Sequence, residues 1–100
     1  MVLPRIQHLW HNNASLREAM KREPLEYAQM LYYDDVLFDH RTLRYLIDTM
    51  GPTQVVVGSD YPFMSRTQTP DQEFEALGLN DQERQLIGSQ NCLRFLGEEI

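Results

Sequence analysis

The stretch from residue 30 to residue 58 constrains the fold most, because strand-like and helix-like patterns alternate in it. "MLYYDDVLF" (30–38) is rich in aromatic and β-branched residues, which predicts a short strand centred on residues 31–33. The three valines within residues 54–58 predict a second strand. A strand, a helix and a strand in this order favour a parallel pair joined by a right-handed crossover. We therefore expect an α/β fold.

The helix between these two strands has the most regular pattern in the chain. Asp39 precedes it as a capping residue. Gly51 and Pro52 follow it, and a glycine before a helix-breaking proline is typical of a helix end. Between them, apolar residues recur at helical spacing and form one stripe, which consists of Leu43, Leu46, Ile47 and Met50.

Helical patterns also flank this unit on both sides. Upstream, residues 1–13 favour an irregular or briefly helical segment, and "SLRE" is a capping-box pattern ahead of a helix over residues 16–23. Pro24 either ends that helix or begins a new turn. Downstream, a capped helix starts at Pro70, and a last helical stretch follows, which Gly88 either continues or divides.

Length, charge and cysteine content limit the class of protein. One hundred residues predict a single domain over residues 1–100. The net charge of −6, without a basic stripe, argues against nucleic acid as a partner. No apolar run approaches the roughly 20 residues that cross a bilayer, and no secretion leader opens the sequence, so no membrane partner is expected. The lone Cys92 cannot form an internal disulfide, which fits a reducing cytoplasm.

A carboxylate, Asp60, follows the valine-rich strand at its exit. In parallel α/β sheets, binding sites form beyond the carboxyl ends of strands. Gly58 allows a close backbone approach or an unusual turn there, and Pro62 stiffens the exit. A carboxylate in this place can ligate a metal or act as a general base. Alternatively, Asp60 caps the turn that follows it.

The same region resembles a known enzyme family. "LYYDDVLFDHRTLRYLIDTMGPTQVVVGSDYPF" is similar to the end of the barrel in the amidohydrolase-related decarboxylases, above all the aminocarboxymuconate-semialdehyde decarboxylase family, which typically reads "YTDxxxxDxxxLxxLxxxxGxDxVxxGTDYPF". The later "NCLRFLG" (91–97) is similar to the family's closing "NAxxLLG". Ser59 replaces the commoner threonine. The positions that fit the first pattern are Tyr33, Asp34, Asp39, Leu43, Leu46, Gly51, Val55, Gly58, Asp60, Tyr61, Pro62 and Phe63.

The resemblance implies a fold, a site and a substrate. The fold would be the C-terminal part of a TIM (β/α)₈ barrel, with about two short parallel strands and four or five helices. Asp60 would lie on the eighth strand, belong to a divalent metal site, usually zinc, and help to handle the protons of metal-bound water. "LPRI" (3–6) implies that Arg5 reaches a partner subunit's site and binds a substrate carboxylate, unless it is an ordinary surface arginine. Phe63 would line the substrate pocket.

The other metal ligands of that family are absent from this sequence. They are a His-x-His pair on the first strand and a histidine on a middle strand, and a further histidine in a "HGGG"-like stretch supports proton transfer. One carboxylate cannot fill a zinc site, which usually takes three or four protein ligands. His8 and His11, spaced i, i+3, either form a substitute site with Asp34, Asp35 or Asp60, or belong to a solvated turn.

Three further features have a functional and a structural interpretation. The adjacent Asp34 and Asp35 either share a proton, if they are buried, or face water. Cys92, in an apolar helical stretch, favours packing as a small hydrophobic residue over a role as nucleophile. Core or interface positions are expected for three aromatic residues, which are Trp10, Tyr32 and Tyr33.

Two functions of different classes follow from the sequence. The first is catalytic: the C-terminal part of a metal-dependent decarboxylase (a lyase) or hydrolase that acts on small carboxylated aromatic or unsaturated compounds and is inactive without a missing N-terminal portion. The second is non-catalytic: a truncated family member that serves as an interaction or oligomerisation module. Because two strands alone leave edges and apolar faces exposed, we expect a homo-oligomer or a rearrangement of the helices around the sheet.

Overall fold

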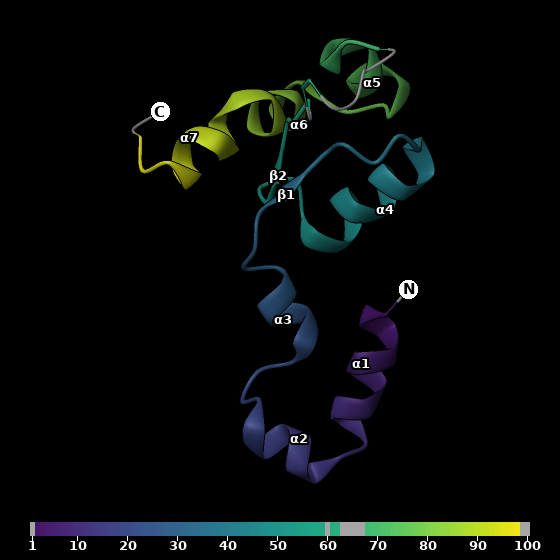
Figure 1. Cartoon of the computed structure of the whole chain (residues 1–100), viewed down its shortest axis with the longest axis vertical. Helices are drawn as coiled ribbons and strands as arrows, with labels where there is room; N and C mark the ends of the chain where they lie inside the picture. Colours follow the sequence, from purple (N-terminus) through teal and green to yellow (C-terminus); the bar gives the residue numbers. More distant parts are fainter. Residues whose placement is uncertain (1, 60, 63–67, 99–100) are drawn as a thin grey trace. The chain divides into compact units, whose positions relative to one another are not determined.

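A computed structural model of the chain describes residues 2–59, 61–62 and 68–98 (Figure 1). The chain divides into two compact units, Met1–Leu31 and Tyr32–Ile100. The described residues form seven α-helices, one π-helical turn and two strands. This is more than the four or five helices expected, because residues 3–11 and 24–28 are also helical and the last stretch is divided. The single domain expected for residues 1–100 stays a prediction.

The first unit consists of three short helices, α1 (Leu3–His11), α2 (Ala14–Ala19) and α3 (Pro24–Ala28). Residues 3–11 thus form a regular helix. Helix α2 begins earlier than predicted, because the side chain of Asn13 accepts a hydrogen bond from Leu16 N at 3.2 Å and caps it in place of the expected Ser15–Glu18 capping box. Pro24 begins α3, at a position where its missing N–H would have no helical partner.

Side-chain hydrogen bonds connect the helices of this first unit. Trp10 Nε1 donates to the carbonyl oxygen of Met20 at 2.9 Å, and Trp10 is half-buried, in keeping with the packed position expected for it. Gln7 joins α1 to the start of α3: its Nε2 donates to Glu23 Oε2 at 2.7 Å and its Oε1 accepts from Leu25 N at 3.1 Å. Polar pairing therefore contributes much of the tertiary structure of these residues.

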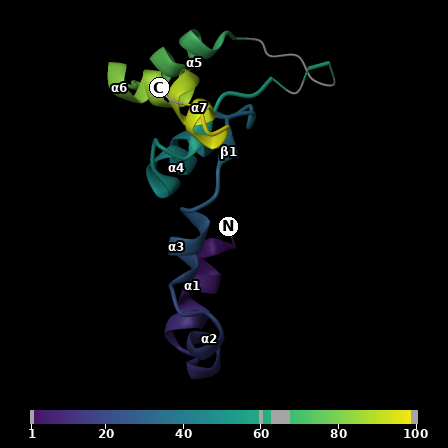
Figure 2. The ribbon, with the colours of Figure 1, turned by 90° about the vertical axis from the view of Figure 1, so that its left-hand side faces the viewer.

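The second unit contains the strand–helix–strand arrangement predicted from the sequence, with β1 (Tyr33–Asp34), α4 (His40–Met50) and β2 (Val55–Val56). The strands are parallel, with Tyr33 opposite Val55 and Asp34 opposite Val56, which confirms the expected parallel pair. Both strands are shorter than predicted, and β1 begins at the end of the expected range. Figures 1 and 2 show this pair beside α4 and close to the C-terminal helices.

Helix α4 begins and ends as its sequence predicts. Asp39 Oδ2 accepts hydrogen bonds from Thr42 N at 3.0 Å and from Thr42 Oγ1 at 2.5 Å. At the other end, Gly51 has φ +89°, a conformation that residues with a Cβ rarely adopt. The apolar stripe faces inward, and Leu43 and Ile47 are buried. This helix is therefore fixed by its two ends and by one buried face.

The C-terminal part of the chain is helical from residue 70 onward, apart from a turn near Gly78. Thr69 and Asn80 each form a full capping box, with Gln72 and with Glu83. Gly88 lies inside a π-helical turn, so the helical path continues through it. The elements are α5 (Pro70–Ala76), α6 (Asp81–Gln85), η1 (Leu86–Gln90) and α7 (Asn91–Phe95).

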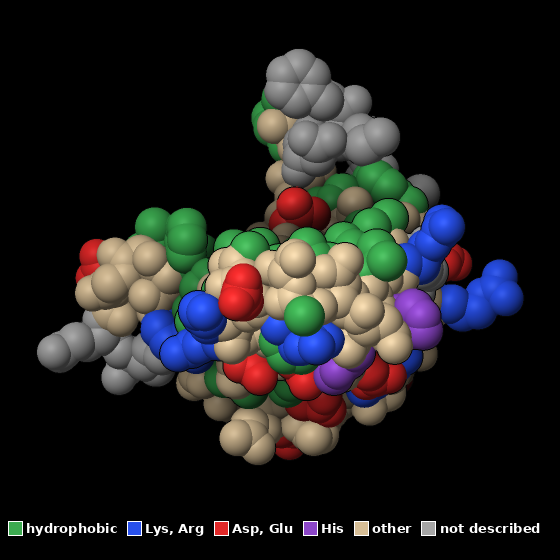
Figure 3. Space-filling view, turned by 90° about the horizontal axis from the view of Figure 1, so that it is seen from below, with side chains coloured by type: hydrophobic (Ala, Val, Ile, Leu, Met, Phe, Trp, Pro, Cys, Tyr) green, Lys and Arg blue, Asp and Glu red, His purple; other side chains and the backbone are tan. Residues whose placement is uncertain are grey.

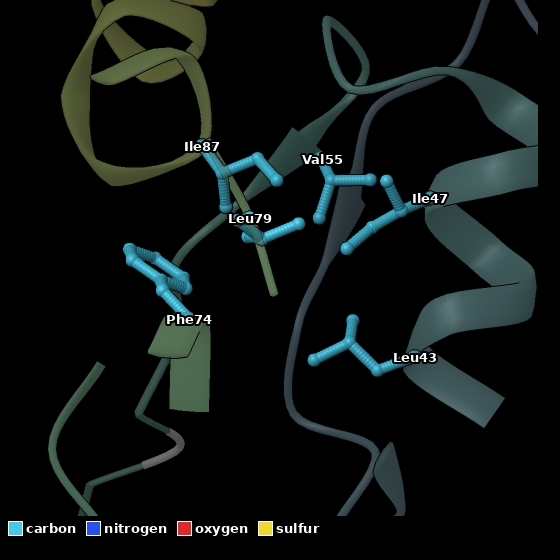
Figure 4. Packing of buried hydrophobic residues seen from close by; sticks show 6 residues of the cluster. All are labelled: Leu43, Ile47, Val55, Phe74, Leu79 and Ile87. Carbon is cyan, nitrogen blue, oxygen red and sulfur yellow. The ribbon is translucent and has the colours of Figure 1, made fainter. Parts of the chain in front are cut away.

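One hydrophobic core joins the strand pair to the helices of the second unit. Val55 on β2 has no exposed surface and lies between Ile47 of α4 and Ile87 of η1 (Figure 4). The remaining buried members of this cluster are Leu43, Phe74 and Leu79. Because side chains alternate along a strand, Val56 and the paired Asp34 point to the opposite face from Val55. The helices thus cover the Val55 face of the small sheet.

The cap of α4 predicts an acid-dependent loss of helix. The hydrogen bonds from Thr42 hold the pKa of Asp39 below its ordinary value, so the cap stabilises α4 above that value and is lost as pH falls through the lowered pKa. We expect Asp39→Asn, which keeps the capping oxygen, to remove this contribution to acid unfolding followed by circular dichroism. The pKa of Asp48 is also lowered, by its hydrogen bond with Arg44, so some acid sensitivity should remain. Identical acid transitions in both proteins would contradict the assignment.

Candidate functional site

Asp60 and Phe63 are the acidic and the aromatic residue that the sequence places at the exit of β2. Both lie outside the described residues. The structure describes the chain as far as Ser59 and again at Tyr61–Pro62, which are joined by a cis peptide bond. The metal-binding or proton-handling role of Asp60 and the pocket-lining role of Phe63 therefore stay predictions. The described residues nearest in sequence to them are those at the exits of β1 and β2.

Asp34 stands at the carboxyl end of β1 and is exposed. Its Oδ1 accepts a hydrogen bond from Val36 N at 3.0 Å, so part of its carboxylate is used to fix the local turn. Its side chain lies on the sheet face opposite Val55. Asp34 thus agrees with the interpretation that this acid faces water.

Asp35, the next residue, behaves differently and is the buried acid of this region. Only 2% of its surface is exposed, and its Oδ1 accepts a hydrogen bond from the backbone N–H of Gly58 at 3.0 Å. The alternative in which both acids face water is therefore wrong for Asp35, and a proton shared with Asp34 stays a prediction. The Asp35 carboxylate crosses from the exit of β1 to the exit of β2, and a hydrogen bond from an N–H offsets part of the cost of burial.

The chain at Gly58 runs very close to the exit of β1. A Cβ atom at this position would lie 3.1 Å from Val36 Cγ2 and 3.3 Å from the Cβ of Asp34. These distances are shorter than ordinary van der Waals contact, so glycine gives the backbone room that another residue would fill. This confirms the close backbone approach, one of the two interpretations of Gly58.

A pocket of about 400 Å³ opens between β1 and the first half of α4. Helix α4 contributes residues at i, i+3 and i+4, and the strand segment contributes two aromatic rings and a carboxylate. The lining residues are Tyr32, Tyr33, Asp34, Leu37, Thr42, Tyr45 and Leu46. Sequence reasoning placed Tyr32 and Tyr33 in the core or an interface and missed this pocket, although the helical spacing of Tyr45 beside a neighbouring aromatic strand was a usable signal.

Arg5 lies in the first unit, on helix α1. Together with His8 it lines a second pocket of about 400 Å³, whose other lining residues are the apolar Pro4 and Leu9. Arg5 and His8 are both exposed. A guanidinium beside an apolar wall is suited to binding a small carboxylate. The role predicted for Arg5 stays a prediction, and the pocket adds His8 as its neighbour.

One histidine of the first unit has an acidic neighbour within that unit. His11 Nε2 lies 3.6 Å from Glu23 Oε1, within the first unit. In residues 2–59, 61–62 and 68–98, no group of three His, Cys, Asp or Glu side chains could hold a metal ion. A substitute site that joins His8 and His11 to Asp34 or Asp35 would combine residues of the two units and stays a prediction, and its Asp60 version lies outside the described residues.

Two residues of α7 fix the segment that leads into β2, and sequence reasoning missed both. Asn91 is fully buried, and its Nδ2 donates to the carbonyl oxygens of Pro52 at 2.6 Å and Val55 at 2.8 Å. Arg94 donates to the carbonyl oxygen of Thr53 and, at 2.8 Å, to Tyr32 Oη. The only available signal was the presence of Asn91 in the stretch "NCLRFLG".

The lone cysteine lies on the outer side of the same helix. Cys92 is exposed, so the packed position predicted for it is wrong. The apolar pattern of residues 86–96 extends beyond the core, since Phe95 and Leu96 are each 64% exposed. The ring of Phe95 instead lies against that of Tyr32, with the ring centres 5.1 Å apart.

The absence of nucleic acid and of a membrane among the partners stays a prediction. On the face shown in Figure 3, blue, red and purple side chains are interspersed. Among the helices that the structure describes, none is both long and apolar enough to span a bilayer.

Comparison with known proteins gives one informative similarity. No family model matches the chain. Over 75 residues, or 74% of its length, the chain is 31% identical to 2-amino-3-carboxymuconate-6-semialdehyde decarboxylase of Dictyostelium discoideum. The matched stretch spans 21% of the length of that relative. The similarity supports the resemblance to the amidohydrolase-related decarboxylases, for the matched part of the chain.

Proposed function

We propose that this chain corresponds to the last βα units of a metal-dependent decarboxylase of the amidohydrolase-related family, working in the cytoplasm. The observation that carries the proposal is the 31% identity to the Dictyostelium decarboxylase over 75 residues. The parallel strand–helix–strand unit is compatible with part of an α/β barrel, in which catalytic residues follow the carboxyl ends of strands. Because the match spans 21% of the relative, activity would need the portion that supplies the other strands.

The proposed substrate is a small carboxylated, unsaturated or aromatic compound, and the reaction is decarboxylation or a related hydrolysis. Arg5 would bind a substrate carboxylate, supported by its place on an apolar-walled pocket of about 400 Å³. Phe63 would line the substrate pocket. Asp60 would act on the reacting group or on the metal, because it follows β2 at the end where such sites form.

A divalent metal, zinc in the first instance, is the cofactor that the family implies. The described residues of this chain do not fit a complete zinc site, because no three of their possible ligand side chains come together. We therefore propose that Asp60 contributes one ligand at most. The remaining ligands would come from another chain or from a longer form of the protein.

The proposal is tested by grafting this chain into the relative. The 75 matched residues of the Dictyostelium decarboxylase are replaced by those of this chain, and decarboxylation of the relative's own substrate is measured. We expect the chimera to be active and to bind zinc. We expect Asp60→Asn in the chimera to lower kcat by about 10²-fold or more, the range typical of a lost acid–base group.

The matched control in the chimera is Asp81→Asn, which changes an exposed aspartate in the first turn of α6. This variant should keep activity within about twofold, since surface substitutions usually have small effects. A folded chimera without activity would contradict the proposal, as would equal activities of the Asp60 and Asp81 variants. Circular dichroism of each variant separates loss of chemistry from loss of fold.

A second function, a non-catalytic interaction or oligomerisation module, is favoured by one observation. In the part of the chain that the structure describes, the sheet has two strands only, and the exposed large apolar side chains include Leu37, Phe38 and Tyr45 beside β1. Open edges and apolar surface favour association with another chain. Light scattering of the purified chain at working concentration should then give the mass of a homo-oligomer, and a monomeric mass would count against this function.

A further inference from the structure

We infer that Asp35 is a positioning residue, whose buried carboxylate holds the exit of β2 against the exit of β1 and so fixes the backbone that leads to the functional end of β2. The inference rests on the proposed function for its catalytic consequence. Its structural basis is independent of that function, because the hydrogen bond from Gly58 N to Asp35 Oδ1 and the burial of Asp35 belong to the described residues.

The geometry of the β2 exit carries this inference. The pairing of β1 with β2 ends at Asp34 and Val56, so the ladder no longer fixes the chain at Gly58. The Asp35 carboxylate binds the Gly58 N–H at 3.0 Å just beyond that point. Asp35 therefore continues the connection between the two chain segments past the end of the sheet.

The backbone at Gly58 also runs close to the exit of β1. A Cβ at position 58 would lie 3.1 Å from Val36 Cγ2 and 3.3 Å from Asp34 Cβ, so there is little space on this side of the backbone. The Asp35 carboxylate holds its N–H. Asp60, the residue proposed to act on metal or substrate, follows Gly58 by two positions in the sequence. A small shift of Gly58 would thus be passed along the chain to the site, where errors of about 1 Å are costly.

The adjacent acid, Asp34, differs from Asp35 in its exposure and in its hydrogen-bond partner. Asp34 is exposed, and its Oδ1 accepts from Val36 N at 3.0 Å, within its own turn. Asp35 is 2% exposed and its partner lies 23 residues away. In the family pattern that the sequence resembles, the aspartate of "YTD" corresponds to Asp34, whereas Asp35 falls on an unspecified position. Asp35 is therefore a feature of this chain, not one taken over from that pattern.

The first test measures hydrogen–deuterium exchange of the Gly58 amide by NMR in the full chain. We expect Asp35→Ala to accelerate this exchange by about tenfold to hundredfold, because the hydrogen bond that the Gly58 amide donates is lost. Asp35→Asn, which keeps an oxygen acceptor of the same size, should restore part of the protection. Asp34→Ala is the matched control, since it removes an exposed carboxylate that bonds Val36 N and should leave the Gly58 amide unchanged.

The second test uses the active chimera of the proposed function. There we expect Asp35→Ala to lower kcat by about 10–100-fold with little change in KM, as is typical of residues that orient a site without touching the substrate. Asp35→Asn should recover part of the lost kcat. Should Asp35→Ala fail to fold, the upfield shift of the Gly58 amide proton in Asp35→Asn, absent from Asp34→Asn, replaces the first readout.

The two tests separate the two ideas. Gly58 exchange that is unchanged in Asp35→Ala would overturn the inference while leaving the proposed function standing. A fully active Asp35→Ala chimera with accelerated Gly58 exchange would overturn the positioning role and leave a purely structural hydrogen bond. An inactive parent chimera with the expected Gly58 result would overturn the proposed function and, with it, the catalytic consequence of Asp35.

Discussion

Replacing Ile47 with alanine is expected to lower the free energy of unfolding of the second unit by about 3 kcal/mol, within the range for large-to-small changes at buried sites. Ile47 is 2% exposed and packs in the cluster that joins α4 to Val55 of β2 (Figure 4). The change removes three buried carbon atoms and leaves a cavity between the helix and the strand. Urea unfolding followed by circular dichroism measures the loss.

The matched control for this substitution is Leu96→Ala at the end of helix α7, in the same unit. Leu96 is 64% exposed, so the removal of the same number of carbon atoms takes away less buried surface and should cost well under about 1.5 kcal/mol. Because a small domain has only about 5–15 kcal/mol of stability, the Ile47 variant should also unfold at a clearly lower temperature. Equal losses in the two variants would show that the α4–β2 core does not dominate the stability of the second unit.

The central strand–helix–strand unit could be predicted because its signals are local. The cap at Asp39, the apolar stripe through Ile47 and the glycine at 51 all act within one helix, and each takes the expected place. Helix α1 could not be predicted with the same certainty, because it has no side-chain cap and no acidic residue in its first turn. The capping box at Ser15 was displaced by Asn13, a competing cap two residues earlier.

The site could be predicted only in part, for a related reason. Gly58 was identified because close approach is one of the few uses of glycine in such a place. Asp35 was treated together with Asp34, since nothing in the sequence indicates which of two adjacent acids is buried. That distinction depends on Gly58, 23 residues away. Hydrogen-bond partners so far apart in the sequence produce no periodic or short-range pattern from which the contact could be predicted.

The same limit applies to the residue that binds the segment before β2. Asn91 donates to carbonyl oxygens 39 and 36 residues upstream, on Pro52 and Val55, and is completely buried. Its Oδ1 has no hydrogen-bond partner among the described residues. The side chain therefore acts here through its two N–H groups, which donate to the carbonyl oxygens of Pro52 and Val55.

This arrangement predicts that Asn91→Asp, a change of nearly constant shape, is among the most damaging single substitutions in the chain. Both donated hydrogen bonds are lost, and a carboxylate is placed against two carbonyl oxygens in a buried position. We expect a loss of at least about 3 kcal/mol in the free energy of unfolding at neutral pH. The loss should become smaller as pH falls, because burial favours the neutral carboxylic acid, which can donate one hydrogen bond.

Asn80→Asp provides the matched control, because the chemistry is the same and the environment is different. Asn80 is exposed and caps α6 by accepting from Glu83 N at 2.8 Å, a role that aspartate performs equally well. The control should change stability by no more than about 0.5 kcal/mol, even with Asp81 and Glu83 nearby. Urea titrations of both variants at pH 7 and at pH 4 decide the matter. If Asn91→Asp were as stable as Asn80→Asp at pH 7, α7 would not hold the entry to β2 through the side-chain amide of Asn91.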